Sequence, residues 1–259
     1  MSFIHDKAPR VSRCLALALV FAGACSRKPA PQTLSIAAAA DLQFALEDLA
    51  RGFRAAHPSL DLRLAYGSSG NFFAQIRNQA PFHLFLSADV AYPRELVRQG
   101  IGARGSVFVY AIGRLAVWVP SASPLDPAAA LQSSPLRRLA IANPQHAPYG
   151  RAAEAALRSL GAYDRLKDKL VLGENVAQTL EFAQSGAADA AIVALSLALA
   201  PPVRGQGRYW EIPAEAYPKI EQGGVIVKDS PAAREFRAWM LSPPGARVLQ
   251  AYGFAPAGN

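Results

Sequence analysis

Short apolar runs alternate with amphipathic stretches along the chain after residue 33. Runs of four to eight apolar residues are typical of buried strands, and apolar residues spaced three and four apart are typical of helices covering a sheet. The first half therefore predicts a strand–helix order repeated three times, which is typical of a parallel sheet with crossover helices. The predicted strands are Leu34–Ala38, Leu60–Tyr66 and Leu84–Ser87, and the predicted helices are Leu42–Ala56, Phe72–Asn78 and Val90–Gln99.

The alternation starts again near residue 111, which predicts a second, similar α/β lobe. One long strand is expected at Tyr110–Val119, because apolar residues dominate this stretch as far as Pro120. The remaining predicted strands are Leu139–Ala142, Ala190–Val193, Tyr209–Ile212 and Gly223–Val227, and the remaining helices are Arg151–Leu160, Val176–Ser185, Ala232–Leu241 and Gly245–Tyr252.

The first two dozen residues have the pattern of an export signal. Three basic residues precede the apolar stretch Leu15–Ala24, which is too short to cross a bilayer. The small residues before Cys25 resemble the lipobox of bacterial lipoproteins, although Ala22 stands where leucine is usual; ordinary signal-peptidase cleavage is the alternative. We expect a signal peptide at 1–24, a tether at 25–33 and a lipid on Cys25, which would hold the exported chain at a membrane.

Composition narrows the classes of function. The net charge of +8 is spread over the 259 residues without a run of five basic residues, so nucleic-acid binding is not expected. A mildly basic body suits an anionic ligand, but an ordinary solvated surface is the preferred explanation. The second cysteine, Cys14, lies in the predicted signal, so neither a disulfide nor a thiolate metal site is expected. His57, His83 and His146 lack metal-ligand spacing, and no metal ion is predicted.

Three strand-to-helix junctions carry the candidate chemistry: the small residues before Asp41, the stretch Gly67–Asn71, and Asn175. Ligands of open α/β sheets bind beyond the carboxyl ends of strands, where helix N-termini attract anions. Each junction also has a simpler interpretation, as a helix N-cap or an ordinary turn. A serine nucleophile at 68–69 would need a general base that the sequence does not supply. Pattern alone predicts a two-lobed α/β protein with candidate anion sites.

Five segments resemble, in order, those of periplasmic molybdate-binding proteins: LSIAAAADL (34–42), AYGSSGNF (65–72), APFHLFLSAD (80–89), LAIANPQHAPYG (139–150) and YGF (252–254). The resemblance implies the two-lobed periplasmic binding protein fold (type II). Each lobe is then a mixed, mostly parallel sheet flanked by helices, and the ligand lies in the interlobe cleft. Lobe 1 is expected at 33–112 and 214–259, and lobe 2 at 113–213.

The resemblance also implies the function. We expect a monomeric, non-enzymatic periplasmic protein that binds molybdate, and also tungstate, without a cofactor. It would deliver the ligand to the permease and ATPase of an ABC importer. Carried over by position, the ligand contacts are the backbone N–H groups of Asp41, Tyr149 and Val176 and the N–H and hydroxyl of Ser69, with Ala40 and Ser68 as neighbours.

Three positions depart from the family pattern. Asp41 stands where many relatives have a neutral residue, so its carboxylate is expected to turn away from a dianion or to cap the helix. Ala194 replaces a tyrosine donor, for which Tyr149 is expected to compensate. His83 replaces an acidic residue and is interpreted as a surface or hinge change without consequence for the ligand. The alternatives are binding of sulfate or phosphate, a secreted hydrolase using Ser69, and a structural lipoprotein.

Overall fold

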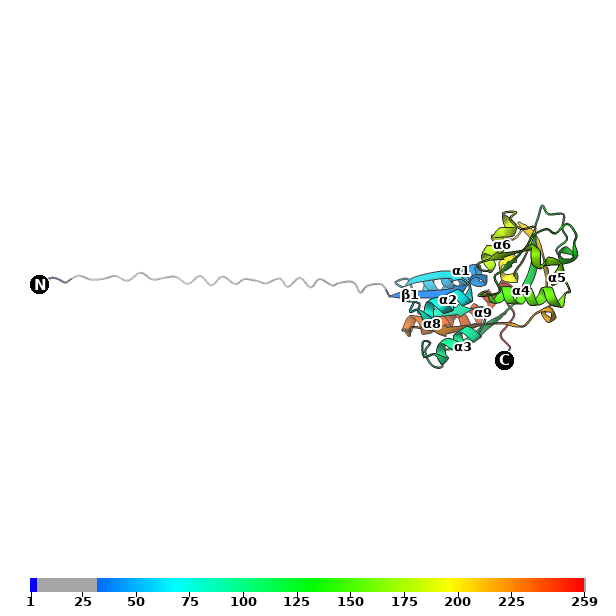
Figure 1. The fold of residues 1–259 in the computed structure, drawn as a ribbon. Coiled ribbons are helices and arrows are strands. Elements are labelled where there is room, and N and C mark those ends of the chain that lie inside the picture. The colour runs from blue at the N-terminus through cyan, green and yellow to red at the C-terminus, as the bar shows by residue number, and fades with distance from the viewer. Residues whose placement is uncertain (4–31, 259) are drawn as a thin grey trace. The chain divides into compact units, whose positions relative to one another are not determined.

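The first lobe is built on a five-stranded sheet with the order β2-β1-β3-β10-β4. Strand β1 is parallel to β2 and β3, whereas β10 is antiparallel to β3 and β4, so four of the five strands point the same way. The strands are Thr33–Ala39 (β1), Asp61–Gly67 (β2), Leu84–Ser87 (β3), Phe108–Gly113 (β4) and Ile220–Ile226 (β10). Its helices are Ala40–Leu42 (η1, 3-10), Gln43–Ala56 (α1), Ser69–Arg77 (α2), Ala91–Arg98 (α3), Pro231–Leu241 (α8) and Pro243–Ala251 (α9) (Figure 1).

The second lobe repeats this arrangement with the order β7-β6-β8-β5-β9, in which β5 is the reversed strand. The strands are Leu115–Pro120 (β5), Leu139–Ala142 (β6), Leu170–Gly173 (β7), Ala190–Ala194 (β8) and Gly207–Glu211 (β9). The helices are Ala130–Gln132 (η2), Pro148–Ser159 (α4), Tyr163–Leu166 (α5), Lys167–Lys169 (η3), Val176–Gln184 (α6) and Leu195–Ala198 (α7), with Ala214–Ala216 (η4) on the way back to the first lobe.

The structure is a computed structural model that describes residues 1–3 and 32–258. Cys25, most of the tether and nearly all of the predicted signal peptide lie outside the described residues. Both sheets belong to one compact unit, Pro31–Asn259. Within the described ranges, no helix is both long and apolar enough to cross a membrane. The prediction of two sheets of similar, mostly parallel topology is confirmed.

The chain crosses between the lobes where the sequence predicted one continuous strand. Tyr110–Val119 is two strands in different sheets, because β4 ends at Gly113 and β5 begins at Leu115. A side chain at Gly113 would meet the Tyr149 hydroxyl at 2.2 Å, so the crossing chain passes directly against the second lobe. The apolar pattern continues through the crossing because both strands are buried, and the break therefore leaves no signal in hydrophobicity.

Two helices begin one turn earlier than predicted. Helix α2 starts at Ser69 rather than Phe72, because the side chain of Ser68 accepts the Asn71 N–H as an N-cap. Helix α4 starts at Pro148 rather than Arg151, and proline is well suited to a first helical position, where no N–H is required. Both shifts place expected ligand contacts inside a first helical turn.

His83 lies in the first lobe, away from the crossing segments. Its Nδ1 accepts the Ser35 N–H at 3.1 Å, while its backbone N–H donates to Ser35 at 2.8 Å. The imidazole of this partly exposed residue extends the hydrogen bonding between β1 and β3, and its lack of consequence for the ligand stays a prediction. Burial, together with the nearby Lys228, lowers the pKa of His83.

Candidate functional site

A small cavity between the lobes gathers the expected ligand contacts. It is lined by residues that follow the carboxyl ends of β1, β2 and β3 in one lobe and of β6 and β7 in the other. All six residues singled out from the sequence line it: Ala40, Asp41, Ser68, Ser69, Tyr149 and Val176. Their contact with an anion stays a prediction, but the structure brings all six together.

Four backbone N–H groups at the cavity have no intrahelical acceptor. Asp41, Ser69, Tyr149 and Val176 each lie in the first turn of a helix, where N–H groups lack a partner one turn earlier. In the part of the chain that the structure describes, none of the four donates a well-formed hydrogen bond to another residue. Four helix starts thus direct free donors and positive dipole ends at one space, a combination that attracts anions.

The hydroxyl of Ser69 is positioned as a fifth donor. The residue is fully buried, and its Oγ accepts the Ala88 N–H at 3.0 Å. Because the oxygen already accepts a hydrogen bond from the protein, its own proton remains available for a ligand. Ala88 also lines the cavity, so this hydrogen bond holds the hydroxyl at the cavity wall.

The carboxyl of Asp41 lies in a buried polar network next to the cavity. The Gln222 side-chain amide donates to its Oδ2 and to the Tyr149 hydroxyl, the latter at 3.0 Å. The Tyr110 hydroxyl donates to the Gln222 Oε1 at 2.9 Å. Among the described residues, Asp41 Oδ1 lacks a well-formed hydrogen bond. Burial raises the pKa of Asp41 to about 6, against the lowering effects of the Gln222 and Tyr149 side chains and of the nearby backbone N–H groups.

This network bears on two of the expectations from sequence. The Asp41 carboxyl engages Gln222 and does not cap the helix, since η1 has no side-chain cap. The Tyr149 hydroxyl faces Gln222 and Asp41 and is buried beside the crossing at Gly113. The hydroxyl accepts the Gln222 amide, and its compensation for the tyrosine donor missing at Ala194 stays a prediction.

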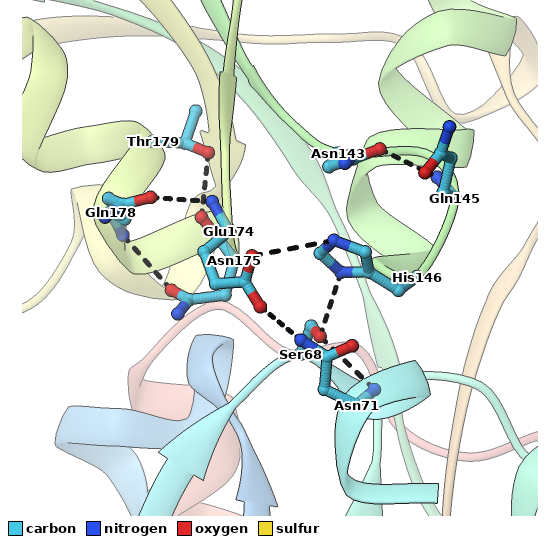
Figure 2. A network of polar contacts seen from close by, with 9 residues as sticks. All are labelled: Ser68, Asn71, Asn143, Gln145, His146, Glu174, Asn175, Gln178 and Thr179. Carbon is cyan, nitrogen blue, oxygen red and sulfur yellow. Dashed lines mark hydrogen bonds and ion pairs between the residues drawn. The ribbon is translucent and has the colours of Figure 1, made fainter. Parts of the chain in front are cut away.

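A serine, a histidine and a carboxylate lie in series at one rim of the cavity (Figure 2). His146 Nδ1 is 3.0 Å from Ser68 Oγ, and His146 Nε2 is 3.6 Å from Glu174 Oε2. The expectation that no base lies near these serines was therefore wrong. However, Ser68 is buried and its Oγ already serves as the α2 N-cap, while Ser69 hydrogen-bonds Ala88 instead. The contact between His146 and Ser68 joins the two lobes.

The cavity suits a compact anion held by neutral donors. None of its lining residues is lysine, arginine or histidine. Across residues 1–3 and 32–258, no group of three or more histidine, cysteine, aspartate or glutamate side chains could hold a metal ion. The charge of a ligand would be met by N–H dipoles and a hydroxyl alone, so cavity size and donor geometry would decide which anion fits.

Sequence reasoning missed the residues that support the site from a distance. Gln222 lies 181 residues from Asp41, and Ser196 donates to the Asp41 carbonyl at 2.7 Å from the second lobe. Neither has a local motif. The N-cap role of Ser68 did have a signal, because serine before a helix is a common cap, and the role of Asn175 as the cap of α6 is confirmed.

Comparison with known proteins agrees with this geometry. The model of a family described as bacterial extracellular solute-binding protein matches residues 34–255. The molybdate-binding protein ModA of Azotobacter vinelandii is 36% identical over 239 residues, covering 89% of this chain and 92% of that protein. ModA of Rhodobacter capsulatus is 36% identical over 193 residues, covering 73% and 75%.

A solved structure shares the architecture. The periplasmic molybdate-binding protein of Azotobacter vinelandii superposes with a TM-score of 0.79 at 34% identity, covering 87% of this chain and all of that one. The predicted resemblance is thereby confirmed over nearly the whole region from which it was inferred. The chain belongs to the bacterial extracellular solute-binding protein family.

Proposed function

We propose that this protein binds molybdate, and also tungstate, in the periplasm and delivers it to an ABC importer. The observation that carries the proposal is the convergence of four free helix-start N–H groups, from Asp41, Ser69, Tyr149 and Val176, on one cavity without a basic residue. The similarity to proteins named for molybdate binding supports this choice of anion.

Capture proceeds by closure of the lobes around the anion. Each lobe supplies two of the four N–H groups, so an open cleft offers half of the donors and a closed one offers all of them. Closure then replaces the water shell of the anion with fixed dipoles. The closed form docks on the permease, whose ATPase supplies the energy for import. Binding requires no cofactor, no chemical step occurs, and the protein acts as a monomer.

Selectivity follows from the neutral donors. Without countercharge, the site discriminates by size, and a cavity fitted to the larger molybdate and tungstate leaves long hydrogen bonds to sulfate and phosphate. Protonated phosphate also needs an acceptor, and the buried Asp41 carboxyl lines the cavity and could supply it. We also propose that a lipid on Cys25 tethers the exported protein to a membrane.

Calorimetric titration of the purified mature chain with a panel of oxyanions tests this function. Molybdate and tungstate should bind, and sulfate and phosphate should give no heat at the same concentrations. Binding of phosphate but not molybdate would make Asp41 an acceptor in the site and overturn the assignment. Turnover of ester substrates would instead favour the hydrolase.

A further inference from the structure

Five residues connect the lobes at one rim of the cavity, and we call them the clasp: Ser68, Gly70 and Asn71 from the first lobe, His146 and Glu174 from the second. Figure 2 shows the side chains of all of them except Gly70. The Gly70 N–H donates to the His146 carbonyl at 2.9 Å. The His146 ring meets Ser68 at 3.0 Å, and the Asn71 side-chain amide donates to Glu174 Oε1. Glu174 also lies 3.6 Å from the His146 ring.

Most of the clasp stands outside the cavity itself. Ser68 lines the cavity, whereas Gly70, Asn71, His146 and Glu174 do not. The Glu174 side chain is 54% exposed, which places it at the solvent edge of the cleft. The hydrogen bonds of these four residues therefore act on the two lobes and not on a bound anion.

Gly70 lies where the two lobes come so close that a side chain would not fit. A Cβ atom there would lie 2.6 Å from the His146 carbonyl oxygen and 2.9 Å from its Cα, and its three nearest neighbours are all atoms of His146. The φ angle of Gly70 is not in the left-handed region, and the residue is the second of α2, where alanine is the better helix former. The obstacle to a side chain is thus the backbone of the opposite lobe.

We propose that the clasp, and the absence of a side chain at Gly70 above all, sets the affinity of the site by permitting the lobes to close. This inference rests on the proposed function. Contacts that exist only between closed lobes stabilise the closed form alone. The apparent affinity for the anion is proportional to the population of the closed form, so a less populated closed form binds more weakly. Gly70, Asn71, His146 and Glu174 are positioning residues, because they act on binding from outside the cavity.

The first test compares molybdate titrations of the wild-type mature chain, Gly70→Ala and Gly258→Ala. Gly70→Ala should raise Kd about tenfold or more and leave the thermal midpoint without ligand unchanged or higher. Gly258→Ala, where an added Cβ meets no atom within 4 Å, should behave as wild type. Equal affinity in Gly70→Ala and wild type would overturn the clasp alone. A wild-type chain that does not bind molybdate would overturn the proposed function as well.

The second test exchanges the partners of the Asn71–Glu174 hydrogen bond. Asn71→Asp places two carboxylates face to face across the cleft and should raise Kd up to about fivefold, as is usual for exposed pairs. Adding Glu174→Gln restores an amide–carboxylate pair in the reverse direction and should recover most of the loss. If the double variant bound as weakly as Asn71→Asp alone, the interlobe contact would not control affinity, and the inference would be wrong.

Discussion

Asp41→Asn removes one buried charge and nearly preserves the shape of the side chain. The residue is 1% exposed, and the oxygen of an asparagine can still accept the Gln222 amide hydrogen bond. The expected consequence is a change in how stability depends on pH, because the wild-type carboxyl titrates and the amide does not.

The magnitude follows from the pKa of the carboxyl. Burial raises that pKa from 3.8 to about 6, a shift of about two pKa units, which corresponds to roughly 3 kcal/mol. Because the folded-state pKa is the higher one, the protonated carboxyl favours the fold below about pH 4, and this contribution is lost as the pH rises through about 6. An asparagine N–H without an acceptor costs roughly 1–3 kcal/mol at every pH.

The free energy of unfolding should therefore change differently in the two proteins. Between about pH 3 and about pH 7.5, Asp41→Asn should gain roughly 3 kcal/mol relative to wild type. Urea unfolding at both pH values measures this difference. Asp164→Asn serves as the control, because the Asp164 side chain is 95% exposed. Parallel pH profiles of wild type and Asp41→Asn would refute the argument that Asp41 is ionised against its burial.

The same charge should act on the ligand. A dianion beside an ionised Asp41 is repelled, so binding favours the protonated carboxyl, and wild-type affinity should fall by up to about tenfold per pH unit above about pH 6. Asp41→Asn should bind molybdate with little dependence on pH in this range. Calorimetry in buffers of different ionisation enthalpy would reveal the proton taken up by wild type. A pH-independent wild-type Kd would show that the carboxyl does not sense the ligand.

The remaining predictions concern the ligand and the anchor. Ser69→Ala should weaken molybdate binding about ten- to a hundredfold through loss of a hydrogen bond to a charged group. It should also destabilise the fold by roughly 1–3 kcal/mol, because the Ala88 N–H loses its acceptor, and wild-type affinity would show that the hydroxyl does not reach the anion. A thousandfold excess of molybdate or tungstate over Kd should stabilise the folded protein by about 4 kcal/mol and so raise its thermal midpoint. Sulfate and phosphate should have little effect on the midpoint. Solution scattering should show a smaller radius of gyration with molybdate, and an unchanged radius would contradict lobe closure. Mass spectrometry of the membrane-associated protein should find a lipid on Cys25, and an unmodified cysteine in a freely released protein would contradict the anchor.

The sequence predicted the elements that have a local pattern. Strand β3 was predicted within its observed bounds, Leu84–Ser87, because four apolar or small residues sit between breaks on either side. The crossing at Gly113 was not predicted, since burial on both sides of it leaves the hydrophobic run intact. Strand β7 was also missed, because its apolar run, Leu170–Leu172, has only three residues and is shorter than the runs of four to eight that indicate a buried strand.

The site residues also divide into those that belong to a local sequence pattern and those that do not. Asp41, Ser69, Tyr149 and Val176 could be placed because each belongs to a short segment shared with the family, and the structure brings all four to one cavity. The supporting contacts could not be placed. Gln222 reaches Asp41 from a strand 181 residues away, and a pairing of that kind depends on strand order, which no local pattern encodes.

The arrangement explains how a tightly closed site could still release its ligand. An anion held by four N–H groups and a hydroxyl forms no ion pair, so opening the lobes removes half of the N–H donors at once and leaves no countercharge to break. The Gln222 amide joins Asp41 of one lobe to Tyr149 of the other, and it does so beside the crossing segments. Any rotation of the lobes must therefore disturb the Asp41 carboxyl together with two of the helix starts that face the anion. Gln222 therefore links lobe closure to the charge next to the bound anion, through its contacts with Asp41 and Tyr149.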